Sequence, residues 1–237
     1  MQLDVFFMLT FAQPTTKPQH STAVKKQIMD LSICFYLKLL QTMSHDSETK
    51  LFILHCENAA PEHHWYLWLE QQLTSMQVKV ERVFLADASH PDIEVWQTCL
   101  QAQLKGLNEH SIVVAHGLSC LALAQFLSQK LQQHTLKAAI FIASLCEPIV
   151  KHPEWDAFIQ QSQFENTRLR SQIQRRVVVF SSNDLVVPAP LSFKFSNLIH
   201  AQMVEVAQAG HFRAEDGYAE FPQLLQMLQA LLKVKLA

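Results

Sequence analysis

Short apolar runs alternate with longer amphipathic segments along the chain from Lys50 onward. The short runs are rich in β-branched residues and almost unbroken by polar ones, which is typical of parallel strands covered on both faces. Each run is therefore predicted to form a strand. The six predicted strands lie at 51–55, 78–84, 111–116, 138–143, 176–181 and 201–207.

Several segments between these runs carry apolar residues at helical spacing. Trp65, Trp68, Leu69 and Leu73 fall on one face of such a segment, and the same pattern predicts helices at 95–104, 121–131 and 221–232. Residues 147–174 form the longest stretch without strand character, and we expect a helix or a cap over the carboxyl edge of the sheet there. Repeated strand–helix units with right-handed crossovers predict an α/β fold, with a mainly parallel sheet of about six strands and helices on both faces.

Residues 1–42 do not continue this pattern. The apolar runs 5–12 and 31–40 are too short to cross a bilayer, and no basic residue precedes the first run as it would in a signal peptide. We expect one domain over 43–237, preceded by an extension of doubtful order and without stable membrane association. A membrane anchor in the extension is the alternative.

Composition excludes several functional classes. Lysine and arginine total 19 against 21 acidic residues, so the charge gives no case for binding nucleic acid or an anionic membrane. The five cysteines are scattered without a C-x-x-C pair, which predicts reduced thiols and a cytoplasmic protein. The chain contains no H-E-x-x-H sequence, and adjacent His63 and His64 would point apart on a helix, so we expect no metal and no cofactor.

The candidate functional residues lie where the predicted strands end, because parallel sheets bind ligands at the carboxyl ends of their strands. Residues 113–127, VVAHGLSCLALAQFL, run from a strand through a sharp turn into a helix, as in a nucleophile elbow of the G-x-S-x-G type. Here the apex is Gly117, and Ser119 comes two residues late. Asp184 and His211 follow in the order of a catalytic triad, although a buried ion pair with only a structural role explains them equally well.

Five stretches of the chain resemble one known family. The chain after Met43 is similar to the small serine-hydrolase family that includes YdeN and retinoblastoma-binding protein nine. The resemblance implies an α/β-hydrolase-like three-layer sandwich that acts on a small-molecule ester. It rests on HCENAAPEHHW (55–65), HPDIEVW (90–96), AHGLSC (115–120), SSND (181–184) and GHFRAEDGYAEFP (210–222).

The positions that differ from the family pattern are ones that the family uses for catalysis. By this resemblance the acid and the base carry over to Asp184 and His211, whereas the nucleophile position falls on Gly117. A family glycine after the first strand falls on Cys56. The resemblance also implies that the backbone N–H groups of Leu118 and of the Cys56 region line an oxyanion hole, with His55 and His116 beside the pocket.

Ser119 is the nearest hydroxyl that could replace the missing nucleophile. It lies two residues beyond the apex, and helical geometry rotates it by about 200°, so we expect its hydroxyl to point away from His211 toward the sheet. A small residue at this place also has an ordinary structural role, which is to let the helix approach the strand closely.

We therefore expect a catalytically degenerate member that keeps a pocket beside His211 and binds a small molecule or a protein. The alternative is an active hydrolase of small carboxylic esters that uses Ser119 or a water activated by His211 and Asp184. A third reading is a sequence change peculiar to this isolate, with an active ancestor. We also predict that Gly117→Ser alone restores ester hydrolysis, because the acid and the base are already in place.

Overall fold

A computed structural model describes residues 49–233 of the chain. The expected domain boundary at Met43, the apolar runs 5–12 and 31–40, and Cys34 lie outside the described residues. The six predicted strands are all present within two or three residues of their expected bounds. They are β1 (Lys50–Leu54), β2 (Lys79–Val83), β3 (Ile112–His116), β4 (Leu136–Ile142), β5 (Ile173–Ser181) and β6 (Gln202–Val206).

The strands form one parallel sheet in the order β2-β1-β3-β4-β5-β6. Leu54 pairs with Ala115 and Ala115 pairs with Phe141, so the ends of the central strands are aligned at the same edge. β3 is buried along its whole length, which explains its unbroken apolar sequence. The predicted fold class is confirmed.

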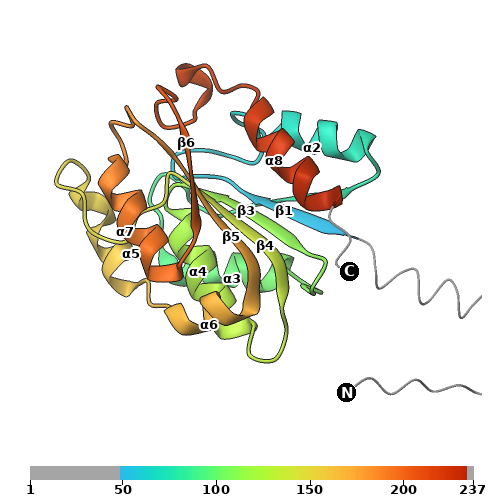
Figure 1. Cartoon of the computed structure of the whole chain (residues 1–237). Helices are drawn as coiled ribbons and strands as arrows, with labels where there is room; N and C mark the ends of the chain where they lie inside the picture. The colour runs from blue at the N-terminus through green and yellow to red at the C-terminus, as the bar shows by residue number, and fades with distance from the viewer. Residues whose placement is uncertain (1–48, 234–237) are drawn as a thin grey trace, which may run out of the picture. The chain divides into compact units, whose positions relative to one another are not determined.

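Helices cover both faces of the sheet (Figure 1). On one face lie α2 (Tyr66–Ser75) and α8 (Pro222–Lys233), which contact each other. On the other face α3 (Ile93–Gln103) packs on α4 (Ser119–Lys130), and α4 packs on α6 (Asn166–Gln172). This second layer continues to α7 (Ala189–Ile199), which packs on α6.

Two helical regions differ from the prediction. The helix α7 was not predicted, and the stretch 147–174 contains α5 (Asp156–Gln161), α6 and the first residues of β5. Two single-turn 3₁₀ segments, Pro153–Trp155 and Ala214–Asp216, complete the described elements. No helix among residues 49–233 is long and apolar enough to cross a membrane.

Candidate active site

The turn after β3 has the shape of a nucleophile elbow. Gly117 at its apex has φ +63°, in the left-handed region, and α4 begins two residues later at Ser119. A side chain held at this apex would project above the carboxyl edge of the sheet, which is where an attacking hydroxyl is needed. Since glycine has no side chain, the backbone shape is present and the attacking group is not.

The carboxylate of Glu57 occupies the space that a side chain at Gly117 would fill. A β-carbon built on Gly117 would overlap Glu57 Oε2, and it would also lie 3.0 Å from the β-carbon of Cys56. A serine at Gly117 would therefore have to displace the Glu57 carboxylate, which argues against the prediction that Gly117→Ser alone restores hydrolysis. The expected pocket beside His211 is narrowed on this side, since the buried Glu57 carboxylate lies against His211 Nε2.

Glu57 also occupies the expected oxyanion hole. The backbone N–H of Leu118 donates a hydrogen bond to Glu57 Oε2 over 3.0 Å. In an acyl-transfer enzyme the amide after the nucleophile stabilises the negative oxygen of the intermediate. Here a carboxylate from the protein itself takes that hydrogen bond.

The second oxygen of Glu57 meets two cationic groups. Arg213 Nη2 donates to Oε1 over 2.8 Å, and His211 Nε2 lies 3.3 Å from the same oxygen. The His211 contact is an ion pair rather than a well-formed hydrogen bond, because Nε2 has no hydrogen-bond partner of acceptable geometry among the described residues. The side chain of Glu57 is fully buried and that of His211 is 2% exposed.

Asp184 and His211 form the expected acid–base pair. His211 Nδ1 lies 2.8 Å from Asp184 Oδ2, and the other carboxylate oxygen of Asp184 accepts hydrogen bonds from the backbone N–H groups of Val186 and Val187. These bonds fix the carboxylate at the exit of β5. The imidazole therefore has the orientation that a triad requires.

Two carboxylates keep the imidazole protonated. Burial acts to lower the pKa of His211, but contacts with Asp184 and Glu57 outweigh it and raise the pKa from 6.5 to about 9. Burial would likewise raise the pKa of Glu57, but His211, Arg213 and the Leu118 amide lower it to about 2. At neutral pH the site therefore contains an imidazolium, which cannot accept a proton from a nucleophile.

A chain of hydrogen bonds connects the first strand to the His211 loop through His116. The Cys56 N–H donates to the Tyr66 hydroxyl (3.1 Å), which lies 2.7 Å from His116 Nδ1. His116 Nε2 lies 2.7 Å from the backbone carbonyl oxygen of His211, an acceptor, so Nε2 carries the proton. The N–H of Cys56 itself is thus hydrogen-bonded within the fold, so an oxyanion-hole amide from this region would have to come from a neighbouring residue.

His55 and Ser119 also have structural partners. His55 is buried, and its ring lies between the carbonyl oxygen of Cys56 (2.9 Å) and the N–H of Leu85 (2.9 Å). The Ser119 hydroxyl donates to the carbonyl oxygen of His116 (2.8 Å) and accepts from the His116 N–H (3.0 Å). Its remaining neighbour is the carbonyl oxygen of Leu54 at 3.5 Å, on the sheet side, and not the ring of His211.

Glu57 is the functional residue that the sequence reasoning missed. The signal was an acidic residue three positions after the end of a buried strand, at the edge of the sheet where the elbow also lies. A carboxylate at that edge needs a cationic or N–H partner, and the apex glycine leaves space for it. The glycine at position 117 and the carboxylate of Glu57 therefore belong to one arrangement, in which the side chain of Glu57 occupies the space above the glycine.

Comparison with solved structures supports the same fold. The crystal structure of the ydeN gene product from Bacillus subtilis superposes with a TM-score of 0.75 at 25% identity, covering 78% of this chain and all of that one. A YdeN-like hydrolase from Pectobacterium atrosepticum matches with a TM-score of 0.59 at 15% identity, covering 82% and 96%. Est1E from Butyrivibrio proteoclasticus matches with a TM-score of 0.60 at 12% identity, covering 80% of this chain and 90% of that one. At such low sequence identity, the last two similarities concern the fold alone.

The sequence comparisons agree with the fold and with the motifs. The YdeN protein of Bacillus subtilis (strain 168) is 26% identical over 179 residues, which is 76% of this chain and 94% of the relative. The model of the serine hydrolase family matches residues 51–230, and this range contains the elbow, Asp184 and His211. The chain belongs to the serine hydrolase family and has the α/β-hydrolase fold of YdeN.

Proposed function

We propose that this protein is a catalytically inactive member of its family and that it acts by binding a small molecule or a protein. The observation that carries the proposal is the position of the Glu57 carboxylate, beside the apex of the elbow and on the Leu118 amide. A family member needs a nucleophile, a free oxyanion hole and an unprotonated base. The buried carboxylate of Glu57 lies where a nucleophile at Gly117 would be, accepts the Leu118 N–H and raises the pKa of His211, so it acts against all three requirements.

The alternative, hydrolysis of small carboxylic esters, has less support. Attack by Ser119 requires a hydrogen bond to His211, but its hydroxyl is bonded to the backbone of His116. Attack by a water requires a neutral imidazole with solvent access, whereas His211 is a buried imidazolium at neutral pH. In a serine protease, loss of the triad serine lowers the turnover number by about 10⁶, and we expect a comparable loss of turnover here.

The first test uses a fluorophosphonate probe and p-nitrophenyl acetate on the full chain at pH 7.5. We expect no covalent labelling and no hydrolysis above that of a His211→Ala variant. Labelling that disappears in Ser119→Ala would refute the proposal. Hydrolysis that disappears in His211→Ala but not in Ser119→Ala would instead assign the reaction to an activated water.

The second test places a serine at the apex of the elbow and removes the Glu57 carboxylate in the same variant. We expect Glu57→Ala/Gly117→Ser to react with the probe, because the serine gains space, the Leu118 amide is freed and one of the carboxylates that protonate His211 is lost. Gly117→Ser alone is the matched control and should not react. If the paired variant is folded and inert, Glu57 is not what blocks the chemistry.

A cytoplasmic location is a further part of the proposal. The cysteines within the described residues, Cys56, Cys99, Cys120 and Cys146, are free thiols, as proteins of reducing compartments usually have. Fractionation of the source cells with an antibody against the chain tests this location directly.

A further inference from the structure

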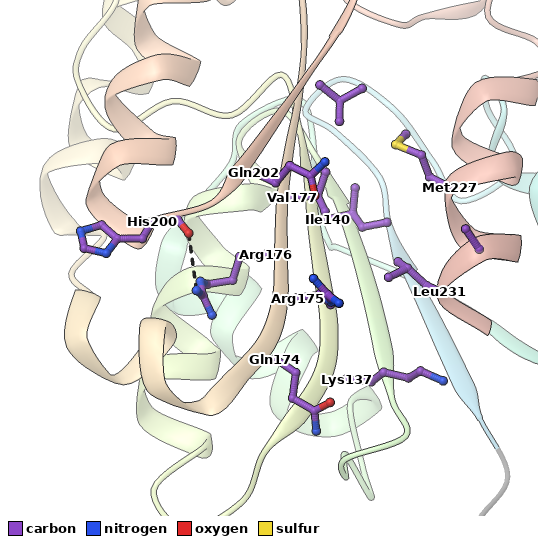
Figure 2. Close-up of a pocket in the computed structure, with 12 residues that line it drawn as sticks. Lys137, Ile140, Gln174, Arg175, Arg176, Val177, His200, Gln202, Met227 and Leu231 are labelled. Atoms are coloured by element: carbon purple, nitrogen blue, oxygen red, sulfur yellow. Dashed lines mark hydrogen bonds between the residues drawn. The ribbon is translucent and has the colours of Figure 1, made fainter. Parts of the chain in front are cut away.

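A groove lies between α8 and the strands β4, β5 and β6, away from the His211 site (Figure 2). Its volume is about 450 Å³, within the range of roughly 300–1,000 Å³ that is usual for small-molecule sites. The sheet face is open here because α8 packs toward α2 rather than over β5 and β6. The groove is thus large enough for a ligand and is not part of the closed triad site.

Cationic, polar and apolar side chains line the groove. Lys137 and Arg175 lie toward the amino ends of β4 and β5 and Leu231 lies near Arg175, whereas Val177, Met227 and the polar Gln202 lie toward the other end (Figure 2). Three residues of strand, from Lys137 to Ile140, span about 10 Å. A molecule that is charged at one end and apolar over a comparable length fits this arrangement.

Within the described residues, Lys137 and Arg175 have no anionic partner. Neither Lys137 nor Arg175 forms an ion pair or a side-chain hydrogen bond within residues 49–233, and no aspartate or glutamate lines the groove. Arg176 is different, because its guanidinium donates to the backbone carbonyl oxygens of Ile199 and Arg170. Lys137 and Arg175 therefore remain available for an anion from outside.

We propose that this groove binds a medium-chain fatty carboxylate, with the carboxylate at Lys137 and Arg175 and the alkyl chain along Val177, Met227 and Leu231. Charge-assisted hydrogen bonds from lysine and arginine are strong and select for an anionic head. The alkyl chain gains affinity by leaving water, in proportion to the apolar area that it buries. The inference goes beyond the proposed function, because the groove contains no residue of the triad site.

The test is isothermal titration calorimetry of decanoate into the full chain. We expect saturable one-to-one binding, weaker binding of hexanoate, and no binding of decyltrimethylammonium, which has an alkyl chain of the same length and the opposite charge. Lys137→Gln/Arg175→Gln should weaken decanoate binding by about tenfold or more, since two charge-assisted contacts are lost. Lys130→Gln, at the exposed end of α4 on the other sheet face, is the matched control and should bind as the parent does.

Several results would overturn the proposal. Absence of saturable decanoate binding, equal binding of decyltrimethylammonium, or full affinity in the double variant would each show that the two cations do not form this site. A dimer of the full chain that dissociates in Lys137→Gln/Arg175→Gln would assign the groove to a second copy instead. Val204→Gln, in the partly exposed part of β6 that lines the groove, gives an independent check, because it should weaken decanoate more than hexanoate.

Discussion

Glu57, Asp184, His211 and Arg213 form a buried charge cluster whose formal charges sum to zero, with two carboxylates and two cations. Transfer of such groups from water is unfavourable, and the arrangement is stable only when each charge keeps its partners. The Leu118 amide adds a hydrogen bond to this cluster. The contacts of Glu57 with its cationic and N–H partners are therefore expected to stabilise the fold.

The coupling between Gly117 and Glu57 can be measured with a double-mutant cycle. Gly117→Ser should lower the free energy of unfolding by about 2–4 kcal/mol, because the serine overlaps Glu57 and must adopt a positive φ. In a Glu57→Ala background the overlap with the carboxylate is gone, and the cost of the positive φ, about 1–2 kcal/mol, remains together with the close approach to the Cys56 β-carbon. Urea denaturation of the four proteins measures the coupling energy.

Additivity within experimental error in that cycle would mean that the two side chains do not compete for the same space. Glu147→Gln serves as a control for loss of a carboxylate. Its ion pair with Lys194 is about half exposed, so its removal should change the stability by less than about 1 kcal/mol.

Among the elements, α2 has a central place because Tyr66 connects it to the elbow and to the His211 loop. The hydroxyl of this buried residue accepts from Cys56 and contacts His116, which in turn holds the His211 carbonyl oxygen. Trp65, immediately before α2, donates from Nε1 to the Phe212 carbonyl oxygen over 3.1 Å. The loop that carries His211 is thus held by α2 and β3 together.

Tyr66→Phe is expected to lower the free energy of unfolding by about 1–3 kcal/mol, because a buried N–H at Cys56 and Nδ1 of His116 lose their partner. Chemical denaturation gives the value, and hydrogen exchange of the His211 loop should report increased opening. Ser75→Ala, which removes an exposed hydroxyl at the end of the same helix, is the control and should have little effect. Unchanged exchange in the loop would contradict the connection.

At this scale the strands could be predicted and α7 could not. The strands β1, β3 and β4 are recognisable because they are buried along almost their whole length and their sequences are nearly all apolar. The buried stripe of α7 instead includes Ser192 and Ser196 beside Phe195 and Ile199, so its helical period is hidden by two serines. Similarly, β5 begins at Ile173 and passes through Gln174 and Arg175, which are exposed on the sheet and resemble a loop in sequence.

Asp184 and His211 could be found from the sequence because each comes within five residues of the end of a predicted strand, and the carboxyl edge of a parallel sheet brings such residues together. Glu57 could not be assigned in the same way, since its role depends on the path of the loop after β1 and on the empty space above Gly117. The partners of Cys56 depend likewise on Tyr66, which approaches from another element.

For the whole molecule, the buried ionisable groups predict how stability depends on pH. The pKa of His211 is raised to about 9, so its stabilisation is fully present below pH 6.5 and is lost as the pH rises toward 9. The pKa of Glu57 is lowered to about 2, so its stabilisation is lost as the pH falls from 4.5 toward 2. Burial lowers the pKa of His116 and brings that of His64 to about 4, and these groups favour unfolding below pH 6.5.

We therefore expect the free energy of unfolding to be largest near pH 6.5 and to decrease by an amount on the order of 3 kcal/mol toward pH 9. Urea titrations between pH 4 and pH 9.5 measure this profile. Glu57→Gln should flatten the alkaline side, because one of the two carboxylates that raise the pKa of His211 is neutralised. An alkaline side that is equally steep in both proteins would mean that His211 does not respond to Glu57.

The overlap between Glu57 and a side chain at Gly117 has an evolutionary consequence. A mutation that places serine at the apex meets the Glu57 carboxylate, while a mutation that removes the glutamate takes one counterion from His211 and from the partly exposed Arg213. Either single change is expected to destabilise the fold, so the two positions are expected to change together.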